Sequence, residues 1–227
     1  MPHKGAGRSA RIDPDWLFDT LRDRICLLDY PPGAVLGEAA LAREFGVSRT
    51  PIRAVLQRLA QDGLIESRDG VGTIVTAPDF AEIRDIYLMR QKIAALIGEM
   101  APRSASAADV AAIDALIART RAVVERFEIG EYWRINHDKH FLVARVIGNR
   151  VLAEMWDRLY FQAARMWYGH ARRRPDGVAE ALLAELAETR TAFARDDALA
   201  IGFVQRNHIA YGLQRLERED AARGRSD

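Results

Sequence analysis

Residues 38–75 read EAALAREFGVSRTPIRAVLQRLAQDGLIESRDGVGTIV, and the turn signals within this stretch decide the fold. A short helix fits residues 38–45, because Gly46 can take the left-handed conformation that ends a helix. Ser48 suits the N-cap of a second helix, which we expect to run to Gln61. Two helices joined by such a tight turn indicate a helix-turn-helix.

The segments on either side complete this unit. Residues 64–68 and 73–75 are short strand-like runs around a glycine-bearing turn at 69–72, which predicts a β-hairpin. Upstream, residues 14–29 carry apolar side chains on one helical face, and the PPG at 31–33 stops that helix. The order helix, helix, tight turn, helix, hairpin is typical of a winged helix-turn-helix.

The helix after the tight turn carries a polar stripe. Arg49, Arg53 and Gln57 follow at intervals of four residues and project from one face, with Thr50 beside them. Arginine presents a rigid fork of donors that matches guanine or a phosphate, so the stripe fits a recognition helix in the major groove of DNA. The alternative is an ordinary solvated cationic face. The turn before the helix and the hairpin after it favour the DNA interpretation.

The tip of the expected hairpin offers a second contact. Gly70, Gly72 and Thr73 would let the backbone come close to phosphates or to the minor groove. Asp69 at the same tip opposes this contact, because a phosphate repels its charge.

Residues 21–75 resemble the DNA-binding domain of GntR-type transcription regulators. The resemblance is carried by PPG at 31–33, LAREFGVSRTP at 41–51, RLAQDGL at 58–64 and the G-x-G-x-x-V pattern at 70–75. The residues that it implies as DNA contacts are Arg43, Ser48, Arg49, Thr50, Arg53, Gly70, Gly72 and Thr73.

Length and composition set the outer bounds. The 227 residues suffice for one large or two modest domains, and the net charge of +1 argues neither for nor against a polyanionic partner. Cys26 is the only cysteine, which excludes a disulfide framework and a multi-cysteine zinc site. No run of about 18 apolar residues occurs, so we expect a cytoplasmic protein with no membrane partner.

Beyond Pro78 the sequence changes to long stretches with a period of 3.6 residues, which predict an antiparallel helical bundle and a mainly α fold. The expected helices span 79–101, 106–128, 130–147, 150–171, 178–195 and 197–218. The expected domains are a winged helix-turn-helix at 14–76 and a helical effector-binding and dimerisation domain at 77–218, between a disordered basic arm at 1–13 and a disordered tail at 219–227.

Four polar residues fall on the apolar faces of these expected helices: Arg90, Asn136, His140 and His208. Because buried polar groups need hydrogen-bond or metal partners, their convergence on one cavity would make a pocket for an effector. A buried guanidinium also needs an anion, so Arg90 should meet a carboxylate of the protein or of a ligand. The alternative is unrelated core residues that are satisfied locally, with one internal salt bridge.

The second half of the chain is similar to the FCD effector domain of FadR-type GntR regulators. The similarity is carried by Asn136-x-x-x-His140, the following Gly148-Asn149 and His208. It implies a metal site with an Asp or Asn and a histidine from one helix, a second histidine from the penultimate helix and a third from the last.

Two departures from the FCD pattern bear on the ligand. Leu186 stands where the penultimate helix supplies its metal ligand, so His140 and His208 form an incomplete set and a divalent metal should be weak or missing. Ala94 replaces the family's glutamate, which leaves Arg90 for an anionic ligand.

Two other functions compete with regulation. The His137-Asp138 dyad is also found in HD-type metal-dependent phosphohydrolases, but the only histidine upstream of it is His3. No Ser/His/Asp set, phosphate-binding glycine loop or H-E-x-x-H motif is present, so we expect no catalytic residues and no enzyme. A winged helix that binds another protein would leave Arg49, Arg53 and Gln57 without a role.

We therefore expect a homodimeric, ligand-responsive transcription regulator that acts as a repressor. Its expected partners are an operator in double-stranded DNA, a small carboxylate effector and a second copy of the chain. One recognition helix reads only a few base pairs, so two half-sites are needed for useful specificity.

Overall fold

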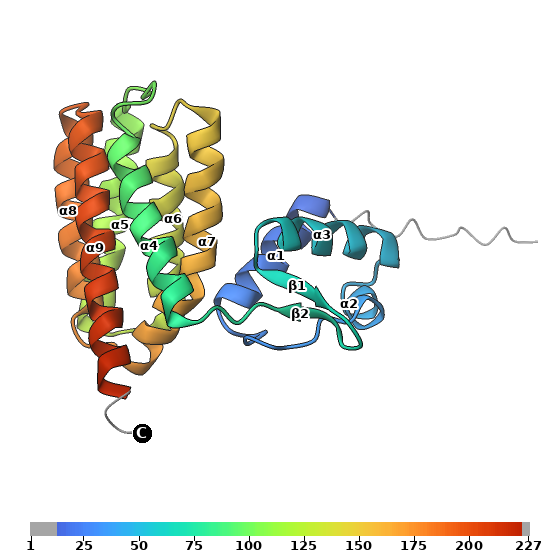
Figure 1. Cartoon of the computed structure of the whole chain (residues 1–227). Helices are drawn as coiled ribbons and strands as arrows, with labels where there is room; N and C mark the ends of the chain where they lie inside the picture. Colours follow the sequence, from blue (N-terminus) through green and yellow to red (C-terminus); the bar gives the residue numbers. More distant parts are fainter. Residues whose placement is uncertain (1–12, 224–227) are drawn as a thin grey trace, which may run out of the picture. The chain divides into compact units, whose positions relative to one another are not determined.

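The computed structural model describes residues 13–223, and the chain divides into two compact units between Ala77 and Pro78 (Figure 1). The expected arm at residues 1–13 lies outside the described residues except for Asp13. That residue is not part of a tail, because its carboxylate accepts a hydrogen bond from the Asp15 amide and caps the first helix. The mainly α class is confirmed.

The first unit is a winged helix-turn-helix with its elements in the predicted order. They are α1 (Pro14–Cys26), α2 (Glu38–Glu44), α3 (Arg49–Gln61), β1 (Ile65–Arg68) and β2 (Gly72–Val75). The two strands pair antiparallel, from Ile65 opposite Val75 to Arg68 opposite Gly72. Side chains of α1 and α3 that face one another form the core, including the fully buried Leu21 and Ile52.

Two helix ends in this unit differ from expectation. α1 ends at Cys26 rather than Asp29, because Leu28 has a φ of 66° and a right-handed helix cannot contain that conformation. Ser48 stands at the N-cap of α3 with an extended backbone, but its side chain makes no capping hydrogen bond. Gly46 has a φ of 65° and makes the tight turn as expected.

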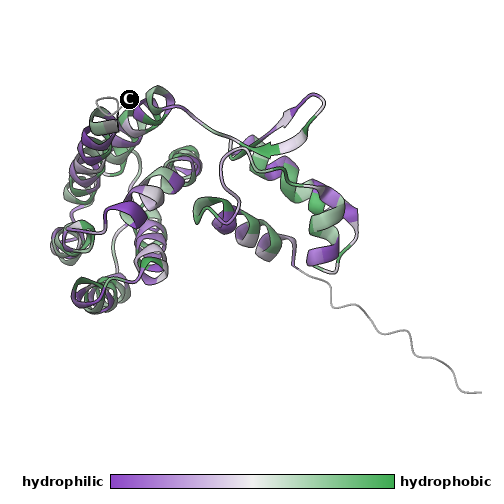
Figure 2. Ribbon diagram, turned by 90° about the horizontal axis from the view of Figure 1, so that it is seen from below, coloured by the Kyte–Doolittle hydropathy of each residue, from purple (hydrophilic) through white to green (hydrophobic). Residues whose placement is uncertain are grey.

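The second unit contains all six expected helices. They are α4 (Phe80–Leu96), α5 (Ala107–Glu125), α6 (Ile129–Ala144), α7 (Arg150–Arg173), α8 (Val178–Ala194) and α9 (Ala198–Arg223). α4 packs against α7 and α9, and α5 packs against α6 and α8. Figure 2 looks along these helices and shows hydrophobic and hydrophilic residues on each. In the described part of the chain, no helix is both long and apolar enough to cross a bilayer.

The expected tail from residue 219 is wrong as far as the structure describes it. α9 continues to Arg223, and Glu219 is only 9% exposed. Its carboxylate lies 2.5 Å from Nδ1 of His170 and accepts a hydrogen bond of 2.9 Å from Nε of Arg173. These contacts with α7 order the end of α9.

Two glycines let α9 approach the region of α4 closely. A Cβ added at Gly202 would lie 2.5 Å from the carbonyl oxygen of Ala94, and one added at Gly98 would lie 2.5 Å from the backbone of Leu199. Real side chains do not tolerate such distances, so these positions require glycine.

Candidate nucleic-acid interface and ligand cavity

The polar stripe predicted on α3 lies on its solvent side. Ile52 and Leu59 are fully buried against the rest of the unit, whereas Arg49, Arg53 and Gln57 are exposed. This division follows from the period of the helix, because the buried and exposed residues alternate every three to four positions.

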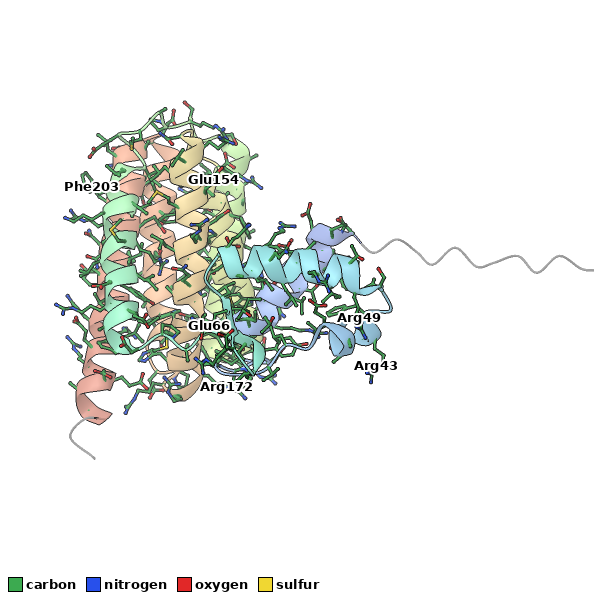
Figure 3. The ribbon with its side chains drawn as sticks, turned by 45° about the vertical axis from the view of Figure 1, so that its right-hand side comes forward. Arg43, Arg49, Glu66, Glu154, Arg172 and Phe203 are labelled. Carbon is green, nitrogen blue, oxygen red and sulfur yellow. The ribbon has the colours of Figure 1, made fainter. Side chains whose placement is uncertain are left out.

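The remaining expected contacts on the two helices are also exposed. Ser48 and Thr50 lie at the start of α3, and Arg43 lies in the last turn of α2. Figure 3 shows Arg43 and Arg49 at the same end of the winged helix, on neighbouring helices. The surface therefore combines cations with the free amides of a helix N-terminus, which attract phosphate.

Arg53 has a partner that the sequence did not reveal. Its Nε donates to Oε1 of Glu38 at 3.1 Å and its Nη2 donates to Oε2 at 3.0 Å. These hydrogen bonds lower the pKa of Glu38 and raise the pKa of Arg53. No spacing rule connects one helix with the next in this way. The side chain of Arg53 is exposed and that of Glu38 is 34% exposed, so the pair contributes little to the stability of the fold.

The hairpin tip is open, as its glycines require. Gly70 and Gly72 have φ values of 73° and 106°, and no atom lies within 4 Å of where a Cβ on either would be. Thr73 is half-buried, and its carbonyl accepts a hydrogen bond from the Leu36 amide, so it is less accessible than the glycines. The exposed Asp69 adds a negative charge at the same tip.

A cavity of about 360 Å³ lies inside the bundle. Its lining comes from α4, α6, α7, α8 and α9, and its volume falls in the range of roughly 300–1,000 Å³ that is usual for small-molecule sites. The four polar residues singled out in the sequence all line it: Arg90, Asn136, His140 and His208. The structure thus brings together residues from three helices that are far apart in the chain.

Arg90 enters this cavity without a carboxylate partner among residues 13–223. Its guanidinium lies 5.2 Å from the ring centre of Tyr87 and 5.7 Å from that of Tyr160. Burial raises the pKa of Tyr87, while the hydrogen bond and the charge of Arg90 lower it. No carboxylate oxygen of the described residues lies within 4.0 Å of the guanidinium, so residues 13–223 do not supply the anion expected for Arg90.

His140 is held as a neutral ring. It is 2% exposed and stacks between Tyr160, at 3.9 Å between ring centres, and Trp156, at 5.3 Å. Burial lowers its pKa to about 4, although the hydrogen bond to Asp157 works in the opposite direction. Because the carboxylate only accepts, Nε2 carries the proton and donates to Oδ1 of Asp157 at 2.6 Å. Nδ1 is buried without a hydrogen-bond partner.

Two carboxylates of α8 line the cavity, and the sequence reasoning missed them. Oε1 of Glu185 lies 2.6 Å from Nζ of Lys139, and Oε2 of Glu188 lies 3.2 Å from Nε2 of His208. Leu186, which the resemblance sets at a ligand position, is fully buried in the apolar core and does not line the cavity. Their spacing of three residues could have revealed them in the sequence, because it places both glutamates on one face of a helix.

These side chains do not fit the metal site that the FCD resemblance implies. His140 donates from Nε2 to Asp157 and offers only its buried Nδ1, while Nε2 of His208 lies 3.2 Å from a carboxylate oxygen of Glu188. The amide nitrogen of Asn136 donates to a main-chain carbonyl, and Leu186 has no donor atom. No group of three or more His, Cys, Asp or Glu side chains in residues 13–223 is arranged to hold a metal ion.

The His137-Asp138 dyad is divided between two environments. The ring of His137 lies against Phe141 and Phe161, at 4.7 and 5.5 Å between ring centres. The carboxylate of Asp138 is exposed and lies 2.6 Å from Nη1 of Arg119. The two side chains face different neighbours, so they do not form the shared metal site of a phosphohydrolase.

Comparison with family models agrees with this architecture. Residues 16–75 match the model of bacterial regulatory proteins of the gntR family, and residues 85–211 match the FCD domain. The second match alone spans more than half of the chain.

The chain is also similar in sequence to individual transcriptional regulators. The chain is 38% identical over 87 residues to an HTH-type transcriptional regulator in an unstable DNA locus of Streptomyces ambofaciens, across 38% of this chain and 36% of that protein. It is 26% identical over 121 residues to the HTH-type transcriptional repressor RspR of Escherichia coli, across 53% of this chain and 52% of RspR. The chain thus spans about a third of the length of the Streptomyces protein and about half of the length of RspR.

A solved structure extends the similarity of fold to almost the whole chain. The Escherichia coli protein McbR/YncC superposes with a TM-score of 0.76, over 91% of this chain and 97% of that one. The sequence identity is 17%, so this comparison supports the fold and not a ligand or an operator.

Proposed function

Because the chain belongs to the GntR family of bacterial regulatory proteins and carries an FCD domain, we propose that it is a homodimeric transcription repressor. It binds an operator in double-stranded DNA in the cytoplasm and leaves the operator when a small carboxylate occupies the cavity. The observation that carries this proposal is the pairing, in one chain, of an exposed cationic stripe on α3 with a cavity in which Arg90 has no carboxylate partner among the described residues. The name of RspR supports repression by analogy.

The winged helix supplies the DNA contacts in this proposal. Arg49, Arg53 and Gln57 would reach base edges or phosphates from the exposed face of α3, where an arginine fork distinguishes guanine from other bases. Arg43, Ser48 and Thr50 would position the helix on the backbone. Gly70 and Gly72 would bring the wing to the phosphates, with Thr73 behind them.

The helical unit supplies the response and the second copy of the chain. A dimer places two recognition helices on two half-sites, and ligand binding that changes their spacing lowers the affinity for the operator. A coupling of about 1–3 kcal/mol between the two sites is sufficient for regulation. The proposal assigns no catalytic residue.

Selection of duplexes from a random-sequence pool tests the DNA function, followed by fluorescence anisotropy on the enriched sequence. We expect an enriched site with two related half-sites, and a loss of affinity in the variant Arg49→Ala. Arg121→Ala is the matched control, because Arg121 is exposed on α5 of the other unit and its loss changes the net charge equally. Failure to retain any duplex at low ionic strength would instead favour a winged helix that binds another protein.

The response is tested on the same duplex with a screen of small carboxylates. We expect at least one of them to weaken operator binding by the unaltered protein. Arg90→Met should abolish that response and leave operator binding intact, because Arg90 lies in the cavity and not on the winged helix. A response that survives this substitution would show that Arg90 is not needed to bind the effector.

A further inference from the structure

The aromatic side chains of this chain are concentrated at the cavity in an unusual proportion. Five of the six tyrosines and three of the four tryptophans line it. None of the eight phenylalanines, all of which lie in the described residues 13–223, does so. An apolar core would accept phenylalanine equally well, so this selection of polar-tipped rings calls for another explanation.

Tyrosine and tryptophan combine a flat apolar face with a group that forms hydrogen bonds. Trp133 lies edge-on to Tyr168, at 5.8 Å between ring centres and an angle of 83°. Nε1 of Trp167 donates to the hydroxyl of Tyr132 at 2.7 Å. These side chains lie along one cavity, where their ring surface forms the walls of the space. A planar ring is the ligand shape that such walls fit best.

The charges in the lining select an anion. Each of the two carboxylates already has a partner, since Glu185 is paired with Lys139 and Glu188 lies against His208. Among the cations, Arg215 donates to the carbonyl of Gly177. Arg90 alone among these charged groups faces only tyrosine rings. A cage of aromatic rings could also hold an organic cation, but Arg90 already occupies two of the ring faces that such a cation would need.

Among residues 13–223, no three His, Cys, Asp or Glu side chains are arranged to hold a metal ion that could bind the ligand. Recognition must therefore come from side chains alone. A guanidinium is well suited to this, since its fork matches both oxygens of a carboxylate.

We propose that the cavity binds an aromatic monocarboxylate directly, without a metal ion, with the carboxylate at Arg90 and the ring against the tyrosine and tryptophan faces. This inference rests on the proposed function, because it names the chemical class of the ligand. It goes beyond that function in excluding both aliphatic acids and metal-held acids as the preferred ligands.

Calorimetry and tryptophan fluorescence on the full chain, after treatment with EDTA, test the proposal. Three of the four tryptophans line the cavity, and the fourth, Trp16, is 52% exposed in α1, so quenching reports mainly on the cavity. The probes are benzoate, 4-hydroxybenzoate and 1-naphthoate. Cyclohexanecarboxylate retains the charge without the aromatic ring, benzyl alcohol retains the ring without the charge, and benzyltrimethylammonium reverses the charge.

We expect at least one aromatic acid to bind at least tenfold more tightly than each of the three comparison compounds. Equal binding of cyclohexanecarboxylate would overturn the aromatic part, and tighter binding of the ammonium compound would overturn the anionic part. A requirement for added Zn²⁺ would overturn direct binding. If none of the three acids binds with a Kd below about 1 mM, the whole proposal fails.

The variant Arg90→Gln should weaken the aromatic acid at least tenfold and leave benzyl alcohol unchanged. Arg84→Gln is the matched control, because Arg84 is an exposed arginine on the same helix. Unchanged binding of the acid by a folded Arg90→Gln protein would overturn the assignment. If that variant does not fold, equal binding of benzoate and benzyl alcohol by the unaltered protein would overturn the anion-binding role assigned to Arg90.

Operator binding is measured separately, which keeps the two proposals apart. An aromatic acid that binds without changing the affinity for the selected duplex supports the ligand class and contradicts the regulatory coupling. Release of the duplex by an aliphatic acid, with no effect of the aromatic acids, would support the regulatory coupling and contradict the aromatic ligand class.

Discussion

Arg53 and Glu38 form a two-pronged ion pair between α3 and α2, with both oxygens of the carboxylate engaged at 3.1 and 3.0 Å. Arg53 belongs to the exposed stripe proposed to meet DNA, and Glu38 engages only its Nε and Nη2, so the guanidinium is held in place before a duplex arrives. The same carboxylate also repels phosphates nearby. Glu38 therefore has two opposed effects, on specificity and on affinity.

Glu38→Gln should separate these effects. We expect severalfold tighter binding to a duplex of unrelated sequence, because a negative charge is removed, and a smaller ratio of specific to non-specific affinity, because Arg53 is less well held. Anisotropy titrations on the two duplexes measure both. Glu154→Gln is the control, since Glu154 is an exposed glutamate in the helical unit. An unchanged ratio would mean that Glu38 does not orient Arg53.

Arg53→Ala should reveal whether this arginine reads a base. If its fork meets a guanine, affinity for the selected operator should fall between about fivefold and about 150-fold, and the preference at that base should relax. If it meets only a phosphate, binding should weaken equally on all sequences, and the slope of log affinity against log salt should fall by about 0.9. No change in either quantity would remove Arg53 from the interface.

Gly202→Ala should destabilise the helical unit, because the added Cβ would lie 2.5 Å from the carbonyl oxygen of Ala94. Overpacking of this kind costs about 1–3 kcal/mol in the free energy of unfolding, which urea denaturation measures. Gly212→Ala on the same helix is the matched control. Its Cβ would meet nothing closer than 3.6 Å, so the gain in helix propensity should stabilise the protein by about 0.5–1 kcal/mol. Equal effects at both positions would contradict the close approach.

Periodicity was sufficient to predict much of this molecule. It predicted the exposed face of α3 and placed Arg90, Asn136, His140 and His208 on faces that the structure brings to one cavity. The reason is that an amphipathic helix has one way to bury its apolar side, and the direction of each side chain follows from its position in the turn.

Periodicity could not predict which distant group each of these residues meets. Glu38 opposite Arg53 and Asp157 against His140 depend on how separate helices are placed, which no local pattern encodes. Glu219 lies in a polar stretch that resembles a tail, and its contact with α7 orders it. Local propensity predicts a tail for this stretch, but a tertiary contact overrides that propensity.

His140 provides a test of the buried environment through the pH dependence of stability. Its pKa is about 4 in the folded chain and about 6.5 in an unfolded one, so the unfolded state binds the proton more readily. The stability that the neutral ring contributes is fully present above pH 6.5 and is lost as the pH falls from 6.5 to about 4, by about 3 kcal/mol in total. Urea unfolding at several pH values should show this loss in the unaltered protein and a shallower dependence in His140→Gln. The difference between the two curves reports on His140 together with its hydrogen bond to Asp157, and parallel curves would mean that the ring is not held neutral.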